Sequence, residues 1–346
     1  MRKYWHDPLK RRMLKAQLRS LKSRRKRKDW LNRKRKGQIG VSKVDRDFYY
    51  ERSNAHTVDA PRNFSIKKNT DAVFKFISDL KGVKSRLGNR SVFINLDKCT
   101  YISSGSIALM ISAIRELKLY KVKVSGSYPE DPKVRATLER SGFFKYVNGK
   151  VSEENKQTSN TILQQGVSTV DPAIVAPFVL KAMTFLWGKP YRNPRIQSLL
   201  VELMANTINH AFPKTSLSKW HLSIAFDAVE KKVCFTFIDN GHGILNTLNL
   251  KFATIIKALV LNSNEQILVA AFDGAFGSRT KEKKRGRGLP NVKKCFTENF
   301  IRNLVVITND VYLDFEHHTT KKLKQKFEGT CFYWELNLNC NSWNTL

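Results

Sequence analysis

A glutamate and an asparagine, Glu202 and Asn206, lie four residues apart in a segment whose apolar residues have helical spacing. Residues at positions i and i+4 of a helix project from the same face, so the carboxylate and the amide would lie one turn apart. An amide oxygen is a neutral ligand for Mg²⁺, which keeps most of its waters and also contacts phosphates. A carboxylate one turn earlier can order or deprotonate a water, contributing about 10²–10⁴-fold in rate. On its own, the pair is also compatible with a solvated helix face.

Three glycine-containing segments follow this pair along the chain. The first is Asp239-Asn-Gly241-His-Gly243, which comes directly after the strand-like run KKVCFTFI. The second is Gly286-Arg-Gly288-Leu289 and the third is Gly329-Thr330. Glycines permit close approach of the backbone to a ligand, and glycines just before a helix let backbone N–H groups hold phosphate. Taken singly, each segment would indicate only a turn.

The order of the four segments resembles the N, G1, G2 and final Gly-Thr boxes of the GHKL ATPases, in particular the type found in anti-sigma-factor kinases. The resemblance covers about residues 170–340 and implies an ATP-binding domain that uses Mg²⁺. It implies that Asn206 is the Mg²⁺ residue, that Glu202 is the catalytic base and that Asp239 accepts a hydrogen bond from the adenine amino group. It also implies that the remaining box residues bind the nucleotide: Gly241, Gly243, Gly286, Gly288, Leu289 and Thr330.

Residues 170–340 would therefore adopt the Bergerat-type α/β sandwich, with a mixed sheet covered by helices on one side. The periodicity predicts one amphipathic helix over residues 194–211 and strands over 231–238 and 331–338. Residues 245–285 would form a lid with helices over 253–261 and 265–272. Several cations near the second glycine pair could neutralise phosphate charge, and the sequence does not choose among them: Arg279, Lys284, Arg285 and Arg287.

Residues 58–148 predict a separate α/β unit. Strand-like runs at 91–96 and 121–125 alternate with helical patterns at 71–87, 105–119 and 131–141, which favours parallel strand pairing. The run VFINLDKCTYISSGSIALMISAIRELK resembles a STAS domain, the fold of anti-sigma-factor antagonists. In that family a serine of an Asp-Ser-Ser-Gly turn can be phosphorylated. The turn here begins Ile102-Ser103-Ser104, without the aspartate, so we expect Ser103 or Ser104 to cap the helix.

The chain of 346 residues carries a net charge of +33, and much of that charge lies at its start. Residues 1–43 hold 18 Lys or Arg against two Asp, so residues 1–45 predict a basic tail, disordered or helical. Contact of residues 1–38 with nucleic acid and a solubilising role are both open. Residues 149–169 are polar and without periodicity, and we interpret them as a linker.

Five scattered cysteines predict neither a disulfide framework nor a zinc site, and no run of about 18 apolar residues predicts a membrane span. We therefore expect a cytoplasmic protein. Its function is expected to be Mg-ATP binding, as an ATPase whose nucleotide state regulates a protein partner. Two alternatives stay open: a protein serine kinase of the anti-sigma type, and a nucleic-acid-binding protein with ATP as a regulatory ligand. A homodimer is compatible with each.

Overall fold

The computed structural model describes residues 55–85, 91–144, 161–167, 170–211, 219–258, 260, 262–276 and 288–342, together with residues 19 and 22. The chain divides into two units, Met1–Asn54 and Ala55–Leu346. The predicted basic tail and the cation-rich segment around Gly286 fall outside the described residues, except for Arg19 and Lys22. The second unit is of the α/β class that the sequence predicts, and it contains the candidate site.

Residues 55–144 contain a small parallel sheet, as the alternation of strands and helices predicts. Its three strands have the order β1-β3-β5 and are β1 (His56–Asp59), β3 (Ser91–Asn95) and β5 (Lys123–Gly126). A second parallel pair joins β2 (Asn63–Phe64) to β4 (Tyr101–Ile102). The helices are α3 (Thr70–Lys81), which continues into a 3₁₀ turn (Gly82–Ser85), α4 (Ser104–Leu119) and α5 (Pro132–Arg140).

Ser103 caps the N-terminus of α4, which confirms the prediction that one of the two serines has this role. Its backbone is extended, and its Oγ accepts a hydrogen bond from the backbone N–H of Ser106 at 3.3 Å. This bond satisfies one of the N–H groups that the first turn of a helix leaves unpaired.

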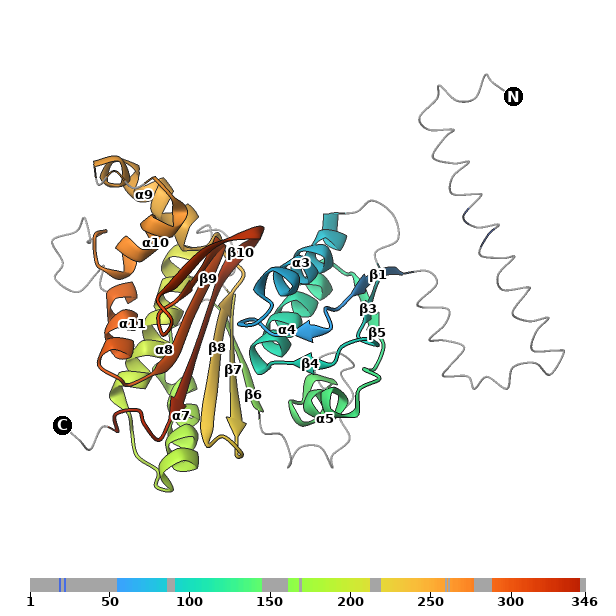
Figure 1. Cartoon of the computed structure of the whole chain (residues 1–346), viewed down its shortest axis with the longest axis horizontal. Helices are drawn as coiled ribbons and strands as arrows, with labels where there is room; N and C mark the ends of the chain where they lie inside the picture. Colours follow the sequence, from blue (N-terminus) through green and yellow to red (C-terminus); the bar gives the residue numbers. More distant parts are fainter. Residues whose placement is uncertain are drawn as a thin grey trace, which may run out of the picture. The chain divides into compact units, whose positions relative to one another are not determined.

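The second half of the unit is built on a five-stranded sheet in the order β6-β7-β8-β10-β9. The strands are β6 (Thr161–Val167), β7 (Lys219–Asp227), β8 (Lys232–Asp239), β9 (Arg302–Asp314) and β10 (Thr319–Asn337). The helices are α7 (Pro172–Trp187), α8 (Pro194–Asn206) with a following π-helical segment (Thr207–Ala211), α9 (Ile244–Ala258), α10 (Asn264–Phe272) and α11 (Gly288–Thr297). One face of the sheet packs against these helices (Figure 1).

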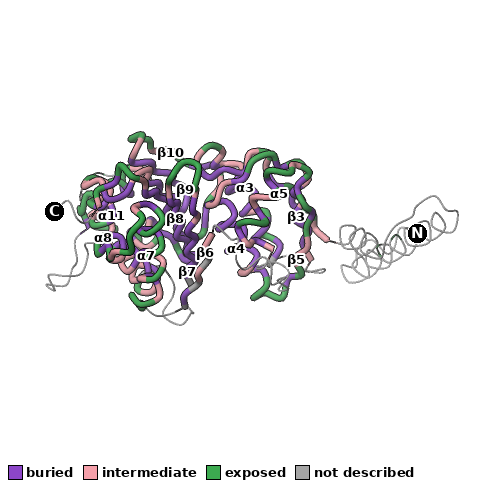
Figure 2. Tube along the Cα trace, turned by 90° about the horizontal axis from the view of Figure 1, so that it is seen from below, coloured by how far each residue is buried: buried purple, intermediate pink, exposed green. Residues whose placement is uncertain are grey.

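The opposite face of the sheet is covered as well, by α3 and α4 of the first half. Side chains alternate between the two faces of a sheet along a strand, and β8 has apolar side chains on both of its faces. Val233, Phe235 and Phe237 pack with the helices of the second half, whereas Cys234 and Ile238 pack with α3 and α4. The strands β7 and β8 are accordingly buried along much of their length (Figure 2).

Three predictions about this half are wrong. Every pairing of the described strands is antiparallel, so the sheet is antiparallel rather than mixed. β7 with β8 and β9 with β10 form hairpins, and β6 with β7 and β8 with β10 form long antiparallel ladders. The sheet is covered on both faces rather than one, since β8 and β10 carry apolar residues on both faces. Residues 161–167, assigned to the linker, form the edge strand β6, which pairs with β7 from Thr161 to Val167. Among the described strands, β6 lies at the edge of the sheet, and three of its seven residues are polar: Thr161, Gln164 and Gln165.

The helix predicted over 194–211 is α8 followed by the π-helical segment. The buried residues of α8 recur at helical spacing, as the periodicity predicts, and are Ile196, Leu199, Leu200, Leu203 and Met204. The segment α9 consists of two helical stretches with a kink at Phe252 between them, so the lid helix predicted from residue 253 begins directly after the kink, and the stretch from Ile244 to the kink was not predicted.

Candidate functional site

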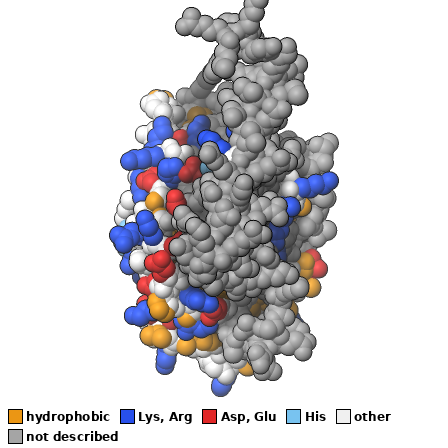
Figure 3. Space-filling model, turned by 90° about the vertical axis from the view of Figure 1, so that its right-hand side faces the viewer, with side chains coloured by type: hydrophobic (Ala, Val, Ile, Leu, Met, Phe, Trp, Pro, Cys, Tyr) orange, Lys and Arg blue, Asp and Glu red, His pale blue; other side chains and the backbone are white. Residues whose placement is uncertain are grey.

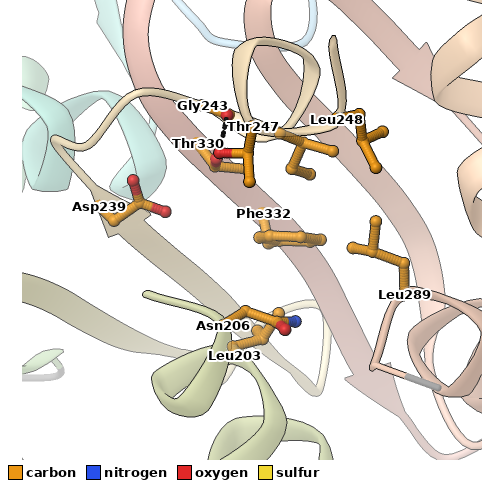
Figure 4. A pocket seen from close by; sticks show the side chains of 10 residues that line it. Leu203, Asn206, Asp239, Gly243, Thr247, Leu248, Leu289, Thr330 and Phe332 are labelled. Atoms are coloured by element: carbon orange, nitrogen blue, oxygen red, sulfur yellow. Dashed lines mark hydrogen bonds between the residues drawn. The ribbon is translucent and has the colours of Figure 1, made fainter. Parts of the chain in front are cut away.

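A pocket opens between α8, the beginning of α9, α11, the end of β8 and the middle of β10 (Figure 4). It encloses about 530 Å³ of empty space, counted to its open mouth. Its lining residues are Leu203, Asn206, Asp239, Gly243, Ile244, Thr247, Leu248, Leu289, Thr330 and Phe332. Five of the residues predicted from the sequence line it together, although they are spread over more than 120 positions of the chain: Asn206, Asp239, Gly243, Leu289 and Thr330.

Asp239 is the last residue of β8 and is directly opposite Thr330 in the antiparallel register with β10. Its side chain is buried, and Oδ1 accepts a hydrogen bond from the backbone N–H of Gly241 at 2.9 Å. Burial raises the pKa of Asp239 from 3.8 to about 6, while hydrogen bonds from Gly241 and Thr330 and the charge of Lys81 act in the opposite direction. The carboxyl is therefore mostly ionised at neutral pH and has acceptor capacity left to use.

The loop after Asp239 is fixed by polar side chains of β9. Asn309 Nδ2 donates to the carbonyl of His242 at 2.9 Å, and its Oδ1 accepts from the backbone N–H of Leu245 at 3.1 Å. Gly243 has φ of +80°, and a Cβ there would come within 2.4 Å of Asn309 Oδ1. Both the left-handed backbone and the close contact require glycine at this position. Gly241 contributes the N–H group to Asp239 and is itself outside the lining of the pocket.

Glu202 and Asn206 project from the last turns of α8, as their spacing predicts. Asn206 lines the pocket, and its Nδ2 is buried without a hydrogen-bond partner among the described residues. Burial also raises the pKa of the Glu202 carboxyl. Gly288, at the start of α11, lies against both side chains: a Cβ there would be 2.5 Å from Glu202 Oε1 and 2.9 Å from Asn206 Nδ2.

Between the carboxylate of Asp239 and the amide of Asn206 the pocket is an apolar slot. In Figure 4 the ring of Phe332 lies at the centre of the view, with Asp239 on one side and Leu289 on the other. Leu203, Ile244 and Leu248 complete the apolar lining. The arrangement offers a flat apolar surface for a ring, a carboxylate at one end to accept a hydrogen bond, and a second polar cluster at Asn206.

Positive charge is not gathered at the described part of this pocket. None of its ten lining residues is Lys or Arg. On the face shown in Figure 3, Lys and Arg side chains of the described residues are interspersed with Asp and Glu. The predicted phosphate-neutralising cations, Arg279, Lys284, Arg285 and Arg287, lie outside the described residues, as does Gly286.

Sequence reasoning missed Phe332, Thr308 and Asn309. Thr308 Oγ1 accepts from the backbone N–H of Ile244 at 2.9 Å, so together with Asn309 it holds the beginning of α9. The signal was present, because Thr-Asn-Asp interrupts the apolar strand run VVITNDVYL. Polar residues within a buried strand need partners, and these two find them in the loop after Asp239.

No helix among the described residues is both long and apolar enough to cross a membrane. No protein-family model matches the chain, and no curated protein matches it in sequence. The functional assignment therefore depends on the residues of the pocket and on the resemblance of their pattern to the GHKL boxes.

Proposed function

We propose that this pocket binds Mg-ATP and that residues 170–340 are a Bergerat-type ATP-binding domain of the GHKL class. The observation that carries the proposal is that one apolar slot is lined both by the buried carboxylate of Asp239 and by Asn206, whose Nδ2 atom is buried and has no hydrogen-bond partner among the described residues. A buried polar atom without a partner is rare in folded proteins, and a bound ligand can supply the missing partner.

Asp239 suits adenine rather than guanine. The adenine amino group donates hydrogen bonds, and an ionised carboxylate only accepts them. Guanine presents a carbonyl oxygen at the corresponding position, which would face the carboxylate without a proton between them. The slot lined by Phe332, Leu203 and Leu248 would bury the faces of the ring.

Asn206 and the start of α11 suit the phosphates and their metal ion. Because Gly288 has no Cβ, the backbone there can lie directly against Glu202 and Asn206. Backbone N–H groups at the N-terminus of a helix such as α11 are natural donors to phosphate. Asn206 would hold Mg²⁺, which would neutralise part of the phosphate charge.

Glu202 is the proposed catalytic base. Its carboxylate lies one turn before Asn206 and beside Gly288, so it is close to the place assigned to the phosphates. A carboxyl with a raised pKa is a better proton acceptor at neutral pH than an ordinary glutamate. The proposed activity is hydrolysis of ATP, with the nucleotide state regulating a protein partner.

The experiment is a comparison of the wild-type chain with Glu202→Gln, using Mg-ATP labelled at the γ-phosphate. Inorganic phosphate is separated from phosphoprotein after incubation. We expect the wild type to release phosphate and Glu202→Gln to release it about 10²–10⁴-fold more slowly while still binding nucleotide. A matched control is Glu139→Gln, whose carboxylate is exposed and pairs with Arg135.

Equal turnover of Glu202→Gln and the wild type would remove Glu202 from the chemistry. Label appearing in the protein rather than in free phosphate would replace the ATPase by the serine-kinase alternative. If the wild type forms neither product at saturating nucleotide, the proposal of ATP chemistry is wrong.

A further inference from the structure

The loop that carries Asp239 is also held from the other face of the sheet. Because successive side chains point to opposite faces, Asp239 faces the pocket and Asn240 faces α3 and α4. Lys81, the last residue of α3, donates from Nζ to Asn240 Oδ1 at 2.8 Å. Asn240 Nδ2 in turn donates to Ser112 Oγ on α4 at 2.7 Å. Both ends of one amide are thus occupied by groups of the first half of the unit.

The two groups that hold Asn240 are themselves fixed. Lys81 Nζ is 2.9 Å from Glu116 Oε2, and the two side chains are 10% and 15% exposed. Ser112 is buried, and its Oγ lies 3.2 Å from Nδ1 of His221 on β7. Hydrogen bonds with an ionised partner are stronger than neutral ones, and networks shielded from water are rigid. Asn240 is therefore held in one orientation by two helices that contribute nothing to the lining of the pocket.

We propose that Lys81 and Ser112 are positioning residues for the nucleotide site: by holding Asn240 they fix the loop from Asp239 to Gly243. The identity of the ligand rests on the proposed function. The mechanical coupling between the first half and the loop does not, because it is a property of the protein without nucleotide.

The charge of Lys81 gives this role a second consequence. Lys81 is the described cation whose field lowers the pKa of Asp239 against the larger effect of burial. Other titratable groups around Asp239 and Asn240 are Glu116 on α4, His221 on β7, Cys331 on β10 and His242 in the loop. Removing the charge of Lys81 should therefore raise the pKa of Asp239 further, so that the carboxylate is lost at a higher pH.

The first experiment measures hydrogen–deuterium exchange in the peptide covering residues 239–246 of the full chain without nucleotide. We compare the wild type with Lys81→Met, Ser112→Ala and the control Lys75→Met. Lys75 is on the same helix but is exposed and pairs with Asp79. We expect exchange in this peptide to rise by about threefold or more in Lys81→Met and Ser112→Ala, and to stay at the wild-type value in Lys75→Met.

The second experiment measures the affinity for Mg-ADP between pH 5.5 and 8.5 in the same variants and in Lys81→Arg. Protonation of the ligand's own phosphates is common to all of them and cancels in the comparison. We expect Lys81→Met to bind more weakly and to lose affinity at a higher pH than the wild type. Lys81→Arg, which keeps the charge, should retain most of the wild-type pH profile.

The proposal is overturned if exchange in residues 239–246 and the pH profile are the same in Lys81→Met, Ser112→Ala and Lys75→Met. If Lys81→Met does not fold, exchange in Ser112→Ala still tests the positioning role, because this substitution removes only the hydroxyl that accepts the hydrogen bond from Asn240. Absence of Mg-ADP binding by the wild type would contradict the proposed function, whereas the exchange result would by itself support or overturn the positioning role.

Discussion

Gly288 lies directly against the carboxylate of Glu202, 86 positions earlier in the chain, with no room for a side chain between them: a Cβ would come within 2.5 Å of Oε1. The same Cβ would be 3.0 Å from Asn206 Oδ1. Two segments recognised separately in the sequence therefore meet at one point. This contact joins the polar end of α8 to the N-terminus of α11.

Gly288→Ala should weaken nucleotide binding because the new methyl group must displace Glu202 or Asn206. We expect affinity for Mg-ADP to fall about tenfold or more with little change in fold, since α11 begins at the edge of the pocket. Calorimetric titration measures the change. The control is Gly82→Ala, where no atom lies within 4 Å of the added Cβ. Wild-type affinity in Gly288→Ala would contradict the assignment of this contact to the phosphate side of the site.

The free energy of unfolding of Asp239→Asn, relative to that of the wild type, should be more favourable at neutral pH than at acid pH. The unfolded carboxyl has its ordinary pKa of 3.8 and the folded one about 6, so the folded state binds more protons between these values. Stability from this group is present at low pH and is lost as the pH rises through 6. An asparagine does not titrate, so the variant should gain about 1–3 kcal/mol on the wild type between pH 3.5 and pH 7.5.

Urea unfolding of both proteins at the two pH values measures this double difference. Titration of all other groups is shared and cancels. A stability difference between the proteins that does not change with pH would mean that the carboxyl of Asp239 is not buried in the way the structure has it.

Ser103, Ser104 and Ser106 should not be a working phosphorylation switch. Ser103 Oγ caps α4 and lies 2.9 Å from Ser106 Oγ, and Ser106 is buried. Gly105 between them faces β8, where a Cβ would lie 3.2 Å from Thr236 Oγ1. Mass spectrometry after incubation with Mg-ATP should find the three serines unmodified. Stoichiometric phosphate on any of them would favour the serine-kinase alternative.

Residues 1–38 should bind polyanions in a salt-dependent way. They contain 17 Lys or Arg against Asp7 and Asp29, and they lie almost entirely outside the described residues. If about six phosphates are neutralised, log K should fall with log salt at a slope near −5. Fluorescence anisotropy with RNA and DNA oligomers at several salt concentrations, on the full chain and on a chain lacking residues 1–38, measures this. Equal binding by the two chains would assign the contact to another basic surface.

The sequence predicts the local elements of the site well because each has its own signal. Glu202 and Asn206 have helical spacing, and Asp239 ends an apolar run, so their places on α8 and β8 follow from periodicity. The parallel pairing of β3 with β5 follows in the same way from alternating strands and helices. The resemblance to the GHKL boxes supplies the expectation that these elements meet.

What the sequence could not predict is how the two halves pack. Apolar residues on both faces of β8 indicate that the sheet has a layer on each side. They do not indicate which segment forms the second layer, which in the structure is α3 and α4. Strand β6 was missed because Ile162 and Leu163 are adjacent and so are Gln164 and Gln165, so the segment lacks the alternation of apolar and polar residues that indicates a strand. The role of Asn240 was missed because its partners Lys81 and Ser112 are 159 and 128 positions away.

Recognition of adenine by Asp239 is the feature on which the proposed nucleotide site depends most. It is tested by calorimetric titration of Mg-ADP and Mg-GDP into the wild-type chain, Asp239→Asn and the control Asp79→Asn, whose carboxylate is half-exposed and pairs with Lys75. We predict saturable binding of Mg-ADP but not Mg-GDP by the wild type and the control, with Mg-ADP affinity weakened about 5- to 150-fold in Asp239→Asn. Absence of Mg-ADP binding by the wild type, or equal affinity in Asp239→Asn, would contradict this recognition.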